Sequence, residues 1–351
     1  MNALKKDTSK KTKKPEIFLS VIIPCHNCRN SIGNLLDSLI QQVRPPRFEV
    51  IIQDDNSTDG FMEIVNGYKL YLDIKYFKNK PREIHCPGNT RNDGLDNAKG
   101  KWVTFIDHDD AFELNAFNEF VKCRDHNDEQ IIVTSDFRDY YPDQKIYGRE
   151  YKDDAITWLH GKFYNRKYLV DNNIRFRENM MSNEDLYFNQ CIFAHLTAEN
   201  KNYSILRQFT YIWTYNDNSL SRRMFKEKEF YIDKYFDEYV EAAVQPWLDM
   251  IPKYPNIKDK AFARCCYILL YAYFYYQSLY MRNGYKHVKK NRDIFEEFLN
   301  NVRNIFNVTN KDILNIIYND DETYNRIRSD SFGGCLRLIE TESFKDFIDH
   351  F

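Results

Sequence analysis

Residues 101–110 read KWVTFIDHDD, a short apolar run that ends in a cluster of acidic residues. The run from Lys101 to Ile106 is typical of a buried strand. Carboxylates that meet at the end of a strand repel one another unless a hard divalent cation neutralises them. We therefore expect the cluster Asp107-His108-Asp109-Asp110 to bind Mn²⁺ or Mg²⁺ that also contacts substrate phosphates. Taken alone, these residues are equally typical of a solvated acidic turn that caps a helix at Phe112.

The segments on either side of this motif alternate between strand and helix patterns. Apolar strand-like runs cover Phe18–Ile23, Phe48–Ile52, Ile74–Phe77 and Ile131–Ser135, and helical spacing covers Ser31–Gln41, Phe61–Tyr71, Asn89–Ala98 and Ser182–Ala194. This alternation predicts an α/β fold with a mainly parallel sheet sandwiched by helices. Such a sheet binds its ligand at the carboxyl ends of its strands, where the acidic motif lies.

A second polar segment, Asp54-Asp55-Asn56-Ser57, follows a neighbouring predicted strand. Its side chains should face the same crevice. A carboxylate there can accept a hydrogen bond from the imide N–H of uracil, or it can cap the following helix; both roles are open, one on each Asp. Arg91, at the start of a predicted helix, is suited to bind a diphosphate, although an Arg in a helical first turn is also common on surfaces.

Together these segments resemble the family 2 glycosyltransferases, which have the GT-A fold. The resemblance covers about residues 18–222. It rests on the segments Ser20–Asn27 (SVIIPCHN), Asp54–Gly60 (DDNSTDG), Arg91–Gly94 (RNDG), Asp107–Asp109 (DHD) and Asn183–Phe188 (NEDLYF). The segments His160–Tyr164 (HGKFY) and Ile174–Phe176 (IRF) are similar to a connecting region of bacterial polysaccharide and wall teichoic acid enzymes.

The resemblance implies a role for each matching residue. Asp55 would bind uracil, Arg91 the donor diphosphate, and Asp107 and Asp109 the nucleotide sugar and the metal. Asp185 would be the catalytic base that activates the acceptor hydroxyl, with Glu184 binding sugar hydroxyls; the alternative is an acidic first turn that stabilises a helix dipole. The other residues expected to contact the nucleotide sugar are Pro24, His26, Asn27, Asn89, His108, Ser219 and Arg222.

One position departs from the family pattern. Ser219 stands where some members have a metal-binding His, which leaves the third protein ligand open, with water as the alternative. The Q-x-x-R-W motif and flanking membrane helices of processive synthases are also absent, which favours the transfer of single sugars. One base without a nucleophile implies inversion at the anomeric carbon.

Charge and cysteine usage indicate which partners and which cellular location to expect. The chain has 50 Lys and Arg against 52 Asp and Glu, a balance that does not favour nucleic-acid binding. Six Lys and one Asp in residues 1–14 make residues 1–16 a basic tail, either solvated and disordered or weakly attached to anionic lipid. Eight Cys without a signal peptide favour reduced thiols and a cytoplasmic location, with peripheral contact at the inner face of the cell membrane.

The C-terminal part has a different pattern. Residues 223–351 show helical spacing, which predicts a smaller all-helical domain after a GT-A domain over 17–222. The segment Cys265–Met281 is 17 residues long without a charge, but it contains six Tyr. We expect a core or interface helix rather than a membrane span, because those hydroxyls are costly to bury in lipid. Its large apolar face predicts association with a second copy or a membrane surface.

These observations predict an inverting, metal-dependent hexosyl- or N-acetylhexosaminyltransferase. It would move one sugar from a UDP-sugar to a polysaccharide, teichoic acid or lipid-linked glycan acceptor. The alternatives are a catalytically silent sugar- or nucleotide-binding protein and a nucleotidyltransferase. A nucleotidyltransferase would favour a Gly-rich basic loop after the first strand, and the residues from Pro24 to Cys28 are not such a loop.

Overall fold

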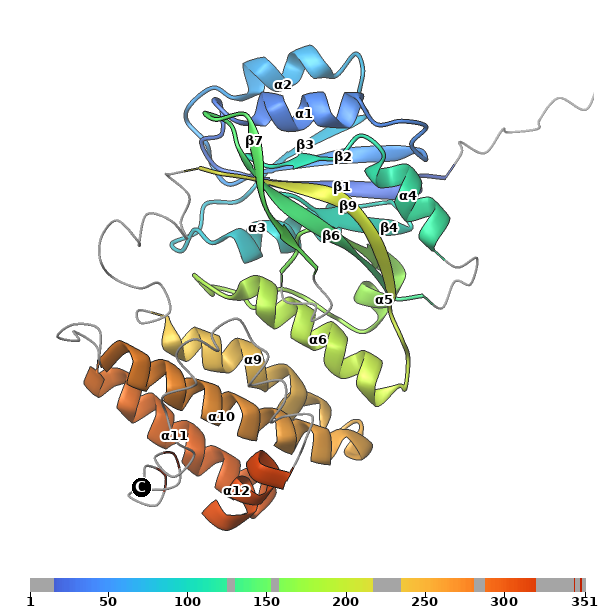
Figure 1. The fold of residues 1–351 in the computed structure, drawn as a ribbon. Helices are drawn as coiled ribbons and strands as arrows, with labels where there is room; N and C mark the ends of the chain where they lie inside the picture. Colours follow the sequence, from blue (N-terminus) through green and yellow to red (C-terminus); the bar gives the residue numbers. More distant parts are fainter. Residues whose placement is uncertain are drawn as a thin grey trace, which may run out of the picture.

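One mixed sheet carries the N-terminal part of the protein. The computed structural model describes residues 16–124, 130–152, 158–216, 235–280 and 288–319, together with Phe344 and Ile348. The strand order is β3 (Ile74–Lys78), β2 (Phe48–Asp54), β1 (Leu19–Cys25), β4 (Trp102–Phe105), β8 (Lys162–Asn165), β6 (Ile132–Tyr141), β9 (Ser204–Thr214) and β5 (Ala111–Phe112), with β7 (Ile146–Tyr151) paired to β6. Figure 1 shows helices on both faces of this sheet.

The predicted parallel sheet is confirmed for its first four strands. Strands β3, β2, β1 and β4 are parallel neighbours, and all residues of β1 and β4 are buried. Strand β1 continues through Pro24 to Cys25, beyond the predicted end at Ile23. Strands β5, β7, β8 and β9 were not predicted from the sequence. Strand β7 is exposed along nearly its whole length, so it lacks the alternation of apolar and polar residues that marks a half-buried strand.

The helices cover the two faces of the sheet in two groups. Helices α1 (Ile32–Ile40), α2 (Met62–Tyr68) and α4 (Ala116–Cys123) contribute to one buried cluster, and α3 (Pro87–Asn97), α5 (Arg166–Asp171) and α6 (Glu184–Ala198) to the other. The predicted helix start at Phe112 is wrong. Phe112 pairs with Tyr211 as part of β5, and α4 begins only at Ala116.

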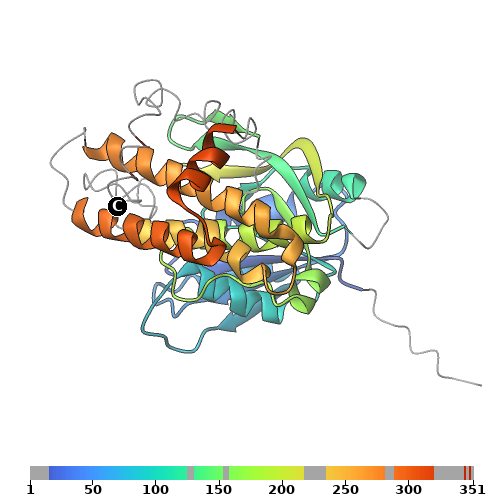
Figure 2. The same cartoon turned by 90° about the horizontal axis from the view of Figure 1, so that it is seen from below.

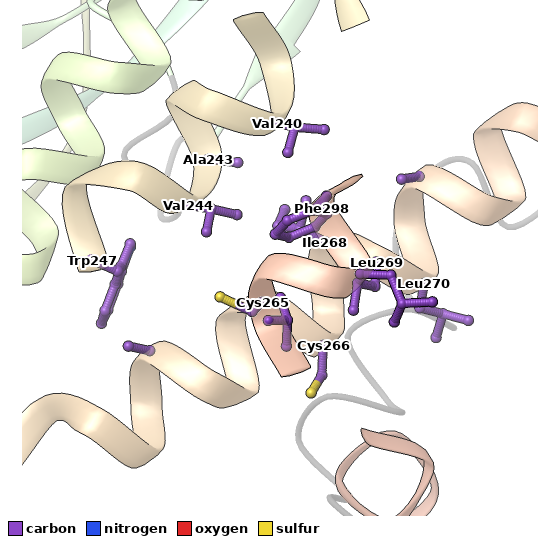
Figure 3. Packing of buried hydrophobic residues seen from close by; sticks show 14 of the residues in the cluster. Val240, Ala243, Val244, Trp247, Cys265, Cys266, Ile268, Leu269, Leu270 and Phe298 are labelled. Atoms are coloured by element: carbon purple, nitrogen blue, oxygen red, sulfur yellow. The ribbon is translucent and has the colours of Figure 1, made fainter. Parts of the chain in front are cut away.

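The C-terminal part is a helical layer, as predicted. It contains α9 (Phe236–Met250), a 3₁₀ turn (Pro255–Ile257), α10 (Lys258–Tyr280), α11 (Val288–Phe306) and α12 (Asn310–Asn319). Helix α6 lies between the sheet and this layer, packed against α9 (Figures 1 and 2). Side chains of α9, α10 and α11 meet in one apolar core (Figure 3).

The uncharged segment that begins at Cys265 lies within α10. Most of its described side chains, including Cys265, Leu269 and Tyr273, are buried in the helical layer, which agrees with the expected core helix. Across the described ranges, every helix lacks the length or the hydropathy needed to span a bilayer. Association with a second copy or a membrane stays a prediction, as does the domain boundary at 222, which falls in the undescribed residues 217–234.

Gly100, which precedes β4, lies so close to neighbouring backbone atoms that a larger side chain should destabilise the fold. A Cβ at this position would lie 2.6 Å from the Ser20 nitrogen and 2.7 Å from the Trp102 oxygen, both backbone atoms. Gly100→Ala should therefore lower the free energy of unfolding by about 1–3 kcal/mol, measured in urea. Gly67→Ala, in α2 with no neighbouring atom within 4 Å, is the control and should be neutral or stabilising. Equal stabilities for the two variants would contradict the prediction.

Candidate active site

The carboxyl ends of β1 and β2 are joined by hydrogen bonds into one polar edge. The Asp55 N–H donates to the Cys25 carbonyl oxygen at 2.7 Å, and His26 Nδ1 donates to the Asp55 carbonyl oxygen at 2.8 Å. Asn27, with a φ of 51°, accepts the Thr58 N–H at 2.9 Å. The residues after Pro24 and the segment at Asp55 are therefore brought together, as the sequence predicted.

The two adjacent aspartates have different partners. Asp54 accepts the Ser57 N–H at 2.9 Å and the Tyr76 hydroxyl at 2.7 Å, so it holds the turn after β2. Asp54 therefore does not cap the following helix, because α2 begins only at Met62 and Phe61 occupies its N-cap position. Asp55 accepts hydrogen bonds from Asn79 Nδ2 at 3.1 Å and His85 Nδ1 at 2.8 Å. Its carboxylate is thus held at the polar edge by groups outside its own turn.

Arg91 connects three elements of the site. Its side chain is only 5% exposed, and its terminal nitrogens donate to Glu184 Oε1 and Asp107 Oδ1, each at 2.7 Å. Burial lowers the pKa of Arg91, but the neighbouring carboxylates of Asp107 and Glu184 outweigh it and leave the pKa above its ordinary value. The guanidinium therefore stays charged and ties α3 to the end of β4 and to the start of α6. Its predicted diphosphate contact stays a prediction.

Asp107 and Asp109 of the acidic motif after β4 have polar partners from other elements. Burial raises the pKa of Asp107, but Arg91 outweighs burial and holds that pKa below its ordinary value. Asp109 accepts a hydrogen bond from Asn216 Nδ2 at 2.8 Å. Asp107 is thus paired with a cation and Asp109 with an amide, and both carboxylates lie just after the end of β4.

Asp110 and His108 attach this turn to the rest of the domain. Asp110 is 2% exposed and accepts the Tyr211 hydroxyl and, at 2.8 Å, the Thr214 N–H. Burial raises the pKa of Asp110 well above its ordinary value, and the nearby aspartates add to this effect. The alternative prediction of a solvated acidic turn is therefore wrong for Asp110, which is buried and hydrogen-bonded to β9. His108 Nδ1 lies 2.8 Å from Ser31 Oγ.

The acidic motif fits a divalent cation in the chemistry of its donors. Mg²⁺ and Mn²⁺ prefer carboxylate oxygens and complete their shells with water or phosphate oxygens, so Asp107 and Asp109 are suitable ligands. Within the described ranges, no group of three or more His, Cys, Asp or Glu side chains is arranged to hold a metal ion. Ser219 and Arg222 lie in residues 217–234, outside the described residues.

The pair Glu184 and Asp185 opens α6, as the sequence predicted. Asp185 Oδ1 accepts the Leu186 N–H at 2.7 Å. Burial and the charge of Glu184 raise the pKa of Asp185 to about 7, and the Leu186 N–H and Arg91 partly offset this rise. A carboxylate with a pKa near neutrality is suited to take a proton from a hydroxyl group.

Several contacts could not be found from the sequence. The side-chain amide of Asn89 exchanges two hydrogen bonds of 3.1 Å with Asn179, and its contact with the nucleotide sugar stays a prediction. Through these hydrogen bonds Asn89 holds the loop before α6. Asn79 and His85, the partners of Asp55, follow it by 24 and 30 residues, and no local pattern marks them as its partners.

The parallel strands with carboxylates at their ends, the helical layer and the acidic start of α6 define a glycosyltransferase-type GT-A fold. Residues 20–182 match the model of the glycosyl transferase family 2, which agrees with the resemblance found in the sequence. The chain is 26% identical over 228 residues to the poly(ribitol-phosphate) β-glucosyltransferase of Bacillus spizizenii strain W23, an alignment that covers 61% of this chain and 35% of that protein.

Two further comparisons agree with this family. The chain is 30% identical over 213 residues to the GalNAc(5)-diNAcBac-PP-undecaprenol β-1,3-glucosyltransferase of Campylobacter jejuni, covering 54% of this chain and 65% of that protein. The crystal structure of residues 1–349 of Staphylococcus aureus TarS in complex with UDP-GlcNAc aligns with a TM-score of 0.62 and 20% identity. That alignment covers 86% of this chain and 84% of the other, and it shows a shared fold that includes the helical region.

Proposed function

We propose that the protein transfers single sugars from a UDP-sugar to a polysaccharide, teichoic acid or lipid-linked glycan, with inversion at the anomeric carbon. The proposal is carried by one observation: Arg91 joins the acidic motif after β4 to the start of α6, which also carries Asp185. Groups suited to a nucleotide diphosphate and a group suited to deprotonate an acceptor are thus brought together.

The relatives support the choice of substrates. The Bacillus relative is named for glucosyl transfer to poly(ribitol phosphate), and the Campylobacter relative for glucosyl transfer to an undecaprenol-linked glycan. The TarS structure is a complex with UDP-GlcNAc. These names favour a UDP-sugar donor and an acceptor that is a phosphate-containing polymer or a lipid-linked glycan.

Each step of the proposed reaction has a residue suited to it. Asp55 accepts a hydrogen bond from the uracil imide, in an orientation maintained by Asn79 and His85. Asp107 and Asp109 would hold a divalent cation, which, when bound, neutralises charge on the leaving diphosphate. Asp185 takes the proton of the acceptor hydroxyl as its oxygen attacks the anomeric carbon. Direct attack without a covalent intermediate inverts the configuration.

A direct assay tests the proposed function. The protein is incubated with a panel of UDP-sugars and Mn²⁺, first alone and then with poly(ribitol phosphate) or an undecaprenol-linked glycan. We expect UDP release that an acceptor accelerates, and a product with inverted anomeric configuration. Tight UDP binding without turnover of any UDP-sugar would instead indicate a catalytically silent binding protein and contradict the proposal.

Removing Asp109 should separate metal-dependent binding from folding. Asp109→Ala deletes a carboxylate that would face both the cation and the diphosphate, so we expect the Mn²⁺-dependent part of UDP affinity to be lost, a weakening of about tenfold or more. Titration calorimetry with and without Mn²⁺ measures this difference. Asp143→Ala, at an exposed aspartate between β6 and β7, is the matched control and should bind as the parent does. Full activity of the parent in excess chelator would contradict the metal requirement.

A further inference from the structure

We infer that the helical layer takes part in catalysis through Glu238 of α9, a positioning residue for the base Asp185. The inference rests on the proposed function. It concerns the loop at 177–183, which connects the sheet side of the site to α6, and the two elements that hold this loop from opposite sides. Figure 1 shows α6 between the sheet and α9.

The position of Asp185, the proposed base, is set mainly by the path of the backbone. In the described ranges, the Asp185 carboxylate has one hydrogen bond, from the N–H of the adjacent Leu186. No other side chain there fixes its direction by a hydrogen bond. The placement of Asp185 therefore follows from the path of the chain through Ser182 and Asn183 into the first turn of α6.

That path is not stabilised by the helix itself. Asn183 occupies the N-cap position of α6 with a φ of 63°, in the left-handed region, and its side chain makes no capping hydrogen bond. N-caps usually accept an N–H of the first turn and so set the direction in which the chain enters the helix. The entry into α6 must be held from outside.

Glu238 provides this external contact. Its Oε2 accepts the Ser182 N–H at 2.7 Å, and the Met181 N–H also hydrogen-bonds to its carboxylate. A half-buried carboxylate that accepts two backbone N–H groups is a strong and directional acceptor. Glu238 thus fixes the two residues that precede Asn183.

The opposite side of the loop is held by α3. Asn89 and Asn179 exchange two hydrogen bonds, and Arg91 binds Glu184, the residue next to the base. The segment before Asp185 is therefore clamped between α3 and α9. A shift of about 1 Å at a reacting group can cost about 100-fold in rate, so release of the α9 side should affect the chemical step.

Donor binding should be largely independent of this contact. The groups proposed to hold UDP are Asp55 after β2, Arg91 and the acidic motif after β4, and the hydrogen bonds that join them to other described residues do not involve α9. Helix α9 itself is anchored to α6 elsewhere, where Trp247 Nε1 donates to Gln190 at 2.9 Å. Loss of the Glu238 contact should therefore change kcat with little change in the KM for the UDP-sugar.

Two variants of Glu238 and one control test the inference. Glu238→Asp keeps the charge but shortens the side chain by one methylene, so its carboxylate no longer reaches Ser182; we expect kcat to fall by about 10- to 100-fold. Glu238→Gln keeps the length and one acceptor oxygen, and we expect kcat within about threefold of the parent. Asp249→Asn, on the same helix, removes an exposed charge that accepts a hydrogen bond from Gln245 and should leave kcat unchanged.

Hydrogen exchange gives a readout that does not depend on turnover. The amides of residues 181–183 should exchange faster in Glu238→Asp than in the parent, while those of β1 and β4 stay protected. The inference would be overturned if Glu238→Asp kept the parental kcat and the parental exchange rates. It would also be overturned if Glu238→Gln lost as much kcat as Glu238→Asp, because that result would indicate an effect of charge. A parent without any UDP-sugar turnover would instead refute the proposed function, and the exchange measurement would still test the contact.

Discussion

Replacing Asp185 with Asn is expected to lower the rate of sugar transfer by about 10²- to 10⁴-fold. The amide keeps the size of the side chain and can still accept the Leu186 N–H, but it cannot take a proton from the acceptor hydroxyl. The affinities for UDP and Mn²⁺ should stay close to those of the parent, because Asp185 is not among the groups proposed to bind them. Steady-state kinetics and UDP titration measure the two effects separately.

The pH dependence of the parent gives an independent check on Asp185. Its pKa is raised to about 7 by burial and by Glu184, against the opposing effects of the Leu186 N–H and Arg91. A base must be deprotonated to accept a proton, so kcat should be low below about pH 6 and should rise as the pH passes through about 7. The groups that act on Asp185 electrostatically are Glu184, Arg91 and Asp107.

The Asp185→Asn variant should lack this rise, since its residual rate comes from positioning and charge stabilisation alone. Asp171→Asn, at the exposed end of α5, is the matched control and should keep both the parental rate and the parental pH profile. Transfer by Asp185→Asn at a near-parental rate, or a product that retains the donor's anomeric configuration, would remove Asp185 from the mechanism.

Replacing Arg91 with Met is expected to abolish measurable transfer and to lower the free energy of unfolding by about 3 kcal/mol at pH 7. The guanidinium is the cation that pairs with both Asp107 and Glu184, and its side chain is 5% exposed. Without it, two carboxylates beside Asp185 lose their counter-charge. Met fills a similar volume, so the loss reports the missing charge and hydrogen bonds rather than a cavity.

The pH dependence of this destabilisation follows from Asp107. Arg91 holds the pKa of Asp107 below its ordinary value of 3.8, so the pair contributes stability above that value and loses it as the pH falls through the lower folded-state pKa. The difference in stability between the parent and Arg91→Met should therefore be largest near pH 7 and smaller at about pH 3. Urea unfolding at the two pH values measures it.

Arg175→Met is the control for Arg91→Met. Arg175 pairs at 3.0 Å with Asp96, whose side chain is 64% exposed, and solvent screens such pairs. This variant should lose less than about 1 kcal/mol and remain active. If Arg91→Met were as stable and as active as Arg175→Met, the central place of Arg91 in the site would be wrong.

The sequence by itself determined the parallel strands of the sheet and the location of their polar edge. Strands β1, β2 and β4 are apolar runs buried on both faces, so burial alone distinguishes them from the segments around them. Because parallel strands place their carboxyl ends at one edge, the motifs at Asp55 and Asp107 had to lie near each other. The acidic start of α6 was equally local, since it follows from residues adjacent in the chain.

Only the tertiary structure decided what individual polar residues do at that edge. Asp54 and Asp55, or Asp109 and Asp110, are chemically identical neighbours, and their different roles come from Tyr76, His85, Asn216 and Tyr211, which other elements supply. The role of Asn89 and the contact from Glu238 to Ser182 have the same origin. A hydrogen bond between distant residues depends on a specific distance and direction, and these exist only once the sheet and the helical layer have packed.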